Sequence, residues 1–252
     1  MGRGSNVDLR LLAGMGAFMV WSLVLGCRLV AQAHRTRALP ELAMGLAFLV
    51  SGLVGTGLGA LARTDDVVPA AWIPICAAGG RLSIHAGALC QAIFTWCVFR
   101  HDAGWAKAMV AATALGLAGA SVGAARAGTL GDPLDAGGWR LLEVALQSAA
   151  IGWGAVEALR YWRLMRRRVR LGLADPVVTN RFLLWAVAIG GGVCALLITG
   201  VLGALELPAA EVRMSYGVSA TVGLISAAGY WLTFFPPRWY CALLVRGARV
   251  GV

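Results

Sequence analysis

The chain has 252 residues, of which 59% are hydrophobic and 13% are charged, and its mean hydropathy is +0.75. Soluble domains carry about 25% charged residues, so this composition excludes a soluble enzyme, a disordered chain and a secreted disulfide scaffold. The apolar residues suffice for about seven membrane spans of roughly 20 residues each. We therefore expect an all-α, polytopic membrane protein, because helices satisfy their own backbone hydrogen bonds in lipid.

Seven apolar stretches predict seven transmembrane helices in a single transmembrane domain over residues 1–252. In chain order they cover residues 11–33, 41–62, 75–99, 104–125, 139–163, 181–204 and 213–235. Residues 67–99 are almost continuously apolar, and we expect Pro74 and the pair Gly79–Gly80 to interrupt them. Residues 236–252 are expected to form a short cytoplasmic tail.

The basic residues indicate the orientation of the predicted bundle. Of the 22 Lys and Arg residues, 15 flank the side that holds the C-terminus and six flank the other side. Cytoplasmic loops carry the excess of Lys and Arg, so we expect the C-terminus on the cytoplasmic side of the membrane and the N-terminus outside. This topology accounts for the net charge of +10, and no nucleic-acid partner is expected.

The first three and the last three predicted helices show a faint similarity. Arg-rich loops closed by proline follow the first and fifth stretches, RTRALPEL (35–42) and RRRVRLGLADPV (166–177), and aromatic runs end the third and seventh. This pattern fits a 3+1+3 duplication, although loop chemistry alone produces the same appearance. Small residues such as Gly52, Gly55 and Gly59 predict close helix packing, within the bundle or in a homo-oligomer.

Three ionisable residues within the predicted spans are the best pointers to function, because burying charge in a membrane is unfavourable. Arg81 and His85 are four residues apart, so they share one helix face. Glu143 lies 17 residues before Arg160, about 25 Å along a helix. Its depth therefore matches the turn that carries Arg81 and His85.

A polar stripe continues from Glu143 along the fifth predicted helix. Arg140, Gln147, Gly154 and Glu157 return to the same face at 100° per residue. In a lipid-embedded helix, such a stripe is expected to face the bundle interior.

Two interpretations of these residues stay open. They line an outward-opening polar pocket that binds a small ligand or relays a proton through His85, or they form a structural ion pair between two helices. The predicted pocket is lined by Arg81, His85, Glu143, Gln147 and Tyr216. The pocket predicts a receptor-like, small-ligand-binding protein, and the alternatives are a small solute transporter and an accessory subunit of a larger membrane complex.

Other motifs are absent or point to the membrane surface. The seventh stretch has no lysine, so no retinal Schiff base is expected there, and no CxxCH sequence indicates covalent haem. No catalytic or metal-binding spacing indicates an enzyme. The basic segment after the fifth stretch is expected to contact anionic lipid headgroups or a separate cytoplasmic output protein. Its predicted contact residues are Arg163, Arg166, Arg167, Arg168 and Arg170.

Four segments resemble known proteins: RTRALPELAMGLAFLVSG (35–52), FTWCVFR (94–100), RRRVRLGLADPVVTNRFLLW (166–185) and FFPPRWY (234–240). They are similar to segments of an uncharacterised group of bacterial seven-helix integral membrane proteins. The resemblance implies topology and bacterial origin, and it implies no activity. The overall layout also resembles rhodopsin-like and receptor-like bundles, but a shared fold does not define a function.

Overall fold

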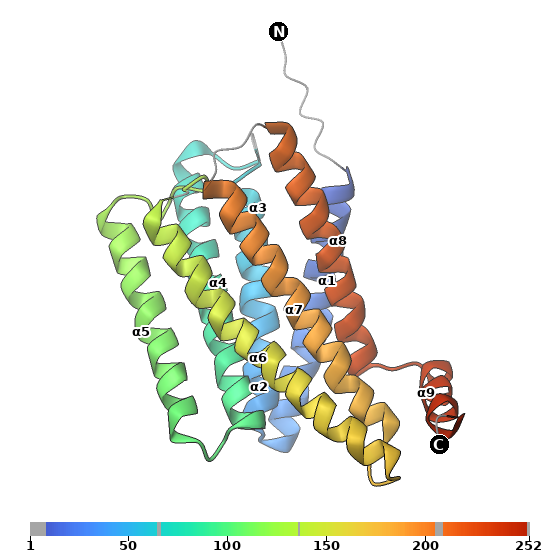
Figure 1. Ribbon diagram of the computed structural model, residues 1–252. Helices are drawn as coiled ribbons and strands as arrows, with labels where there is room; N and C mark the ends of the chain where they lie inside the picture. Colours follow the sequence, from blue (N-terminus) through green and yellow to red (C-terminus); the bar gives the residue numbers. More distant parts are fainter. Residues whose placement is uncertain (1–8, 65–66, 136, 205–208, 251–252) are drawn as a thin grey trace.

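The computed structural model describes residues 9–64, 67–135, 137–204 and 209–250. These residues form helices and no strand, so the predicted all-α class is confirmed (Figure 1). The elements in chain order are α1 (Leu9–Thr36), α2 (Leu39–Leu46), the π-helical η1 (Ala47–Gly55), α3 (Thr56–Leu61), the 3-10 turn η2 (Ala70–Trp72), α4 (Ile73–Phe99), α5 (Gly104–Arg126), α6 (Gly138–Arg170), α7 (Pro176–Ala204), α8 (Ala209–Phe234) and α9 (Arg238–Val250).

Five helical runs in the described part of the chain are long and apolar enough to cross a membrane. They are Met15–Thr36, Leu39–Leu61, Ala70–Phe99, Gly104–Arg126 and Pro176–Ile198. The fold therefore suits a lipid bilayer, as a multi-pass protein. α6 is not among the five runs, and it carries the charged residues Arg140, Glu143 and Glu157. The described apolar stretch of α8, Thr221–Phe234, is shorter than the roughly 20 residues of a full span.

The helices close a ring in which α5 stands outside. Contacts run from α1 to the α2–η1–α3 run, then to α4, α6, α7 and α8, and from α8 back to α1. α5 packs on the outside of this ring, against α4 and α6, and forms one edge of the bundle in Figure 1. α4 and α6 are therefore neighbours that are covered on both sides, and polar side chains between them are shielded from lipid.

The interruption predicted at Gly79–Gly80 is wrong, because α4 is continuous from Ile73 to Phe99. Glycine at position 80 serves packing: a Cβ atom there would lie 3.0 Å from the backbone nitrogen of Gly59. Pro74 occupies the first turn of α4, where its missing amide hydrogen leaves no helical bond unmade. Close helix approach in lipid depends on such small residues.

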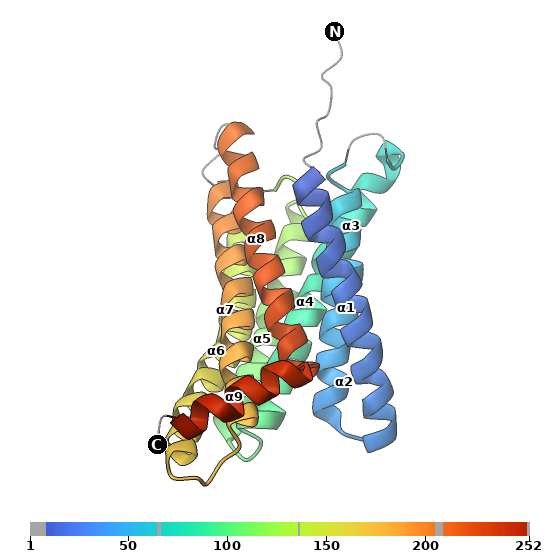
Figure 2. The ribbon, with the colours of Figure 1, turned by 90° about the vertical axis from the view of Figure 1, so that its right-hand side faces the viewer.

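Part of the segment predicted as a tail forms the helix α9. Figure 2 shows α9 lying across one end of the bundle, and we refer to this end as the α9 end. The amide Nδ2 of Asn180, on α7, donates a hydrogen bond of 2.6 Å to the hydroxyl of Tyr240 on α9. Trp239 and Leu243 stay exposed on this helix, as expected of a helix whose apolar face meets the membrane surface.

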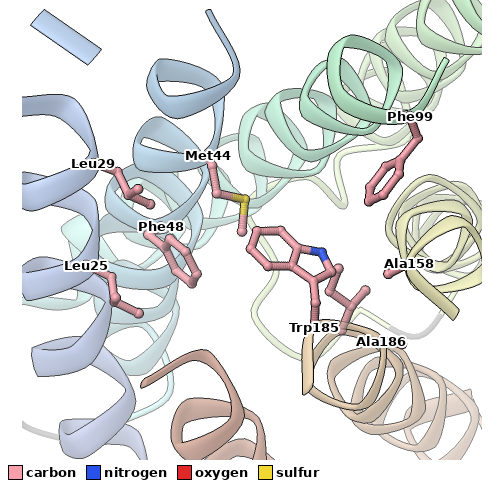
Figure 3. Close-up of a cluster of buried hydrophobic side chains, with 9 residues drawn as sticks. Leu25, Leu29, Met44, Phe48, Phe99, Ala158, Trp185 and Ala186 are labelled. Atoms are coloured by element: carbon pink, nitrogen blue, oxygen red, sulfur yellow. The ribbon is translucent and has the colours of Figure 1, made fainter. Parts of the chain in front are cut away.

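The largest described cluster of buried apolar side chains centres on Trp185 of α7 (Figure 3). Its indole lies between Met44 and Phe48 on one side and Phe99 on the other. The ring of Phe94 stacks on Trp185 with a centroid distance of 4.9 Å. Such aromatic contacts add about 0.5–1.5 kcal/mol beyond area burial. The cluster draws its buried side chains from α1, α2, η1, α4, α6 and α7.

Candidate functional site

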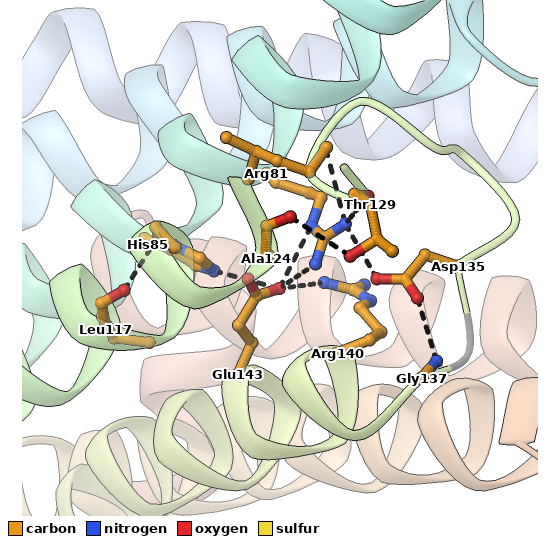
Figure 4. Close-up of polar contacts among 11 residues, drawn as sticks. Arg81, His85, Leu117, Ala124, Thr129, Asp135, Gly137, Arg140 and Glu143 are labelled. Carbon is orange, nitrogen blue, oxygen red and sulfur yellow. Dashed lines mark hydrogen bonds and ion pairs between the residues drawn. The ribbon is translucent and has the colours of Figure 1, made fainter. Parts of the chain in front are cut away.

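The structure brings Arg81 and His85 of α4 against Glu143 of α6, as their predicted depths require (Figure 4). Arg81 donates to Oε2 of Glu143 from Nη2 at 2.9 Å and from Nε at 3.1 Å. The exposed fraction is 8% for the Arg81 side chain and 0% for the Glu143 side chain. The pair is therefore a buried, direct ion pair rather than two walls of an open pocket.

Arg81 also holds the loop between α5 and α6 over the site. Its Nη1 donates to the carbonyl of Thr129 at 2.8 Å and to the carboxylate of Asp135 at 3.1 Å. The guanidinium carries five donors in a fixed plane, so one side chain bonds α6 and the loop together. This arrangement closes the site at the end of the bundle opposite the α9 end.

The charges of the site balance. Arg140 donates to Oε2 of Glu143 at 3.3 Å from the preceding turn of α6. The two guanidinium groups, of Arg81 and Arg140, face the two carboxylates of Asp135 and Glu143. Because an uncompensated buried charge is strongly destabilising, this balance permits the cluster to stay in a shielded position.

The ring of His85 is oriented from α5. Its Nδ1 lies 3.0 Å from Oγ of Ser121, and that hydroxyl donates its one hydrogen to the carbonyl of Leu117 at 2.8 Å. The hydroxyl therefore accepts from Nδ1–H of His85. The other ring nitrogen, Nε2, faces Oε2 of Glu143 at 3.6 Å.

Several polar atoms of the site are buried without a hydrogen-bond partner among the described residues. They are Nε2 of His85, Oε1 of Glu143, and both Oε1 and Nε2 of Gln147. Gln147 lies one turn beyond Glu143 on α6 and is 0% exposed. Leaving one such group unpaired costs about 1–3 kcal/mol, so adjacent turns of α4 and α6 keep an unmet capacity for hydrogen bonding.

A second ion pair joins α4 and α6 near the α9 end. Arg100, at the end of α4, donates to both carboxylate oxygens of Glu157, at 2.7 and 3.0 Å. Between the two ion pairs, Gly154 makes room for polar neighbours. A Cβ atom on Gly154 would lie 2.9 Å from Oγ1 of Thr95 and 3.1 Å from Nε2 of Gln91.

The predicted stripe on α6 is confirmed in its burial. Glu143, Gln147, Gly154 and Glu157 are buried, while Arg140 is partly exposed. Tyr216 falls on residues 202–220, whose side chains lie outside the part of the chain that the structure describes.

Sequence reasoning missed Asp135 and Ser121 as members of the site. Asp135 lies in a loop, where no periodicity ties it to Arg81. Ser121 is a single hydroxyl in an apolar run, and its serine identity in a lipid-embedded helix was the only available signal.

No group of His, Cys, Asp and Glu suited to hold a metal ion occurs within the described ranges. The arrangement offers hydrogen-bond donors and acceptors from an amide, a carboxylate and an imidazole in a shielded place. Comparisons with protein-family models, curated proteins and solved structures found no match to this chain.

Proposed function

We propose that this chain is a receptor-like, small-ligand-binding protein of a bacterial inner membrane, and that His85, Glu143 and Gln147 form its ligand site. The observation that carries the proposal is the set of buried, unpartnered polar atoms on these three side chains. A purely structural ion pair needs only the Arg81–Glu143 contact. The unpartnered amide of Gln147 adds nothing to that contact, whereas a ligand that pairs with it would offset its desolvation.

The proposal includes seven membrane spans. Four of the five apolar runs form the ring together with α6 and α8, and the fifth, α5, packs outside it. The lengths of α6 and α8, 33 and 26 residues, exceed the roughly 20 needed to cross. The excess of basic residues on one side favours the C-terminus inside and the N-terminus outside. The polar site then lies toward the outer face, and α9 lies at the inner surface.

The chemistry of the site favours a small, neutral ligand that carries both a donor and an acceptor. Arg81 and Arg140 already balance Asp135 and Glu143, so a charged ligand would leave one charge uncompensated. A ligand donor would pair with Oε1 of Glu143, and its acceptor would pair with Nε2 of Gln147. Entry requires the loop held by Arg81 to move aside.

Gln147→Leu tests the proposal, because the Gln147 amide makes no hydrogen bond that the substitution would remove. The probe is a panel of small neutral solutes with amide and hydroxyl groups, and the measurement is the thermal unfolding midpoint of the detergent-purified chain. A solute present at 100 times its dissociation constant should stabilise the wild type by about 2.7 kcal/mol, a rise of roughly 5–10 °C. Gln147→Leu should abolish the rise while leaving the unliganded midpoint equal or higher.

Gln91→Leu is the matched control. It makes the same amide-to-leucine change at another buried site with an unpartnered Nε2, beside Gly154 rather than beside Glu143. The solute should stabilise Gln91→Leu as it stabilises the wild type. Equal stabilisation of Gln147→Leu, or no response of the wild type to any solute, would leave the cluster with a structural role only.

A solute transporter and an accessory subunit are the alternative functions. Transport predicts that the stabilising solute enters proteoliposomes and that Gln147→Leu stops its entry, whereas a receptor predicts binding without flux. An accessory subunit predicts that partner chains co-purify and that no solute raises the unfolding midpoint.

A further inference from the structure

The last turns of α6 carry a dense cluster of basic side chains. Residues 160–170 include six arginines and no acidic residue: Arg160, Arg163, Arg166, Arg167, Arg168 and Arg170. Figure 1 shows this end of α6 running beside α7 at the α9 end of the bundle. None of the six arginines forms an ion pair with another part of the described chain. Their charge is therefore free to meet an external anion.

Two shallow grooves follow α6 through this cluster, and Arg163 and Arg167 line both of them. The larger groove, of about 420 Å³, is lined by Val156, Leu159, Arg160, Arg163, Leu164 and Arg167. The smaller groove, of about 270 Å³, is lined by Trp162, Arg163, Arg166, Arg167 and Arg170. The larger groove combines an apolar floor with a basic rim, which is the chemistry of an amphiphilic anion.

The spacing of the arginines favours a single shared anion. Arg160, Arg163 and Arg167 follow one another at three and four residues, so they lie on one helix face. Like charges at this spacing repel each other, and a phosphate placed between them would relieve the repulsion. The adjacent arginine, Arg168, lines neither groove.

The depth of the cluster matches a lipid headgroup. The Arg100–Glu157 ion pair marks the end of the apolar run Ala70–Phe99. Arg163 and Arg167 lie six and ten residues beyond Glu157, about 9 and 15 Å along α6, so their backbones lie just past a headgroup layer that is about 5–8 Å thick. Helical side chains tilt toward the helix N-terminus, so Arg163 and Arg167 reach back toward the bilayer. Val156, which is 65% exposed, lies on the bilayer side of the cluster.

We propose that this face of α6 is a binding site for one anionic phospholipid. The phosphate lies between Arg163 and Arg167, and an acyl chain runs along Val156 and Leu159. The site is separate from the ligand site at Glu143 and lies at the other end of α6, so its test is independent of the proposed function. It also ties the end of α6 to the membrane surface that α9, packed on α7, meets at the same end of the bundle.

Native mass spectrometry of the full chain in detergent tests the site, with phosphatidylglycerol and phosphatidylcholine as probes. We expect phosphatidylglycerol to occupy the chain at least tenfold more than phosphatidylcholine. Arg163→Gln and Arg167→Gln should each lower that occupancy about fivefold, whereas Arg168→Gln should lower it less than twofold. Val156→Ser, which leaves every arginine in place, should lower it about threefold by weakening the acyl-chain contact.

The matched pair Arg167→Gln and Arg168→Gln decides between a built site and diffuse charge, because both remove one positive charge from adjacent positions. Equal losses for the two variants would overturn the proposal. Displacement of the lipid by an equal concentration of inorganic phosphate would also overturn it, since the site would then bind a free anion. All four positions are exposed, and circular dichroism of each variant checks that the helices are intact.

Discussion

Replacing Arg81 by methionine should destabilise the protein more than replacing its partner, Glu143, by leucine. Arg81→Met removes the donor that serves Glu143, Asp135 and the carbonyl of Thr129 together. Glu143 would keep the 3.3 Å contact with Arg140 and the 3.6 Å approach of His85, and the Asp135 side chain, 6% exposed, would lose its cation. Glu143→Leu leaves Arg81 with Asp135 and the loop carbonyl. It also removes the 3.3 Å contact of Arg140, whose side chain is 21% exposed and therefore partly solvated.

The expected magnitudes follow from burial. Removing one member of a buried, hydrogen-bonded ion pair costs about 3–5 kcal/mol. We expect Glu143→Leu near the lower limit and Arg81→Met near the upper limit. In the double variant the two losses should fall short of additivity by about 1–3 kcal/mol, because contacting residues couple by that amount.

The measurement is the free energy of unfolding in mixed micelles, with denaturing detergent as the perturbant. Arg100→Met is the control at the other ion pair of α4 and α6. The Arg100 side chain is 23% exposed, but the Glu157 side chain that it serves is only 6% exposed, so Arg100→Met also leaves a buried carboxylate unpaired and should cost about 3 kcal/mol, less than Arg81→Met. A cost for Glu143→Leu that equals or exceeds the cost for Arg81→Met would refute the assignment of Arg81 as the shared donor.

Two further predictions concern packing. Gly154→Ala should destabilise the chain by about 1–3 kcal/mol, because the new Cβ atom would crowd Thr95 and Gln91. Gly152→Ala is the control, since its Cβ atom would meet its nearest neighbour at 4.0 Å, and it should be neutral or stabilising. Both variants are compared with the wild type by thermal unfolding. Tyr240→Phe should loosen α9, because it removes the hydrogen bond from Asn180, which is worth about 1 kcal/mol. The rate of maleimide labelling at Cys241 should then rise several-fold. An unchanged rate would show that other contacts hold α9.

The helices were predictable because apolar runs are direct consequences of the membrane environment. Each predicted range overlies one helix or one continuous helical run of the structure. The pairing of Arg81 with Glu143 was also predictable, since a helix rises 1.5 Å per residue. Counting back along α4 from Arg100 and along α6 from Arg160 therefore gives comparable distances for His85 and Glu143, whose side chains lie 3.6 Å apart.

The remaining parts of the structure depend on loop contacts and helix packing, which no regular residue spacing in the sequence predicts. The loop that carries Thr129 and Asp135 folds onto Arg81 through tertiary contacts, which no spacing in the sequence expresses. The π-helical stretch Ala47–Gly55 and the continuity of α4 through Gly80 reflect packing against neighbouring helices, which outweighs the low helix propensity of glycine. The interruption expected at Gly79–Gly80 failed for this reason.

The structural and the ligand-binding interpretations of Glu143 do not exclude each other, because its two carboxylate oxygens have different surroundings. Every described contact that Arg81, Arg140 and His85 make with Glu143 reaches its Oε2 atom. Oε1 has no described partner and lies on the residue one turn from the unpartnered amide of Gln147. A ligand that binds Oε1 can therefore leave the ion pair intact. Arg81→Met should then reduce stability strongly, whereas Gln147→Leu should reduce ligand binding with little effect on stability, so the two substitutions separate the two roles.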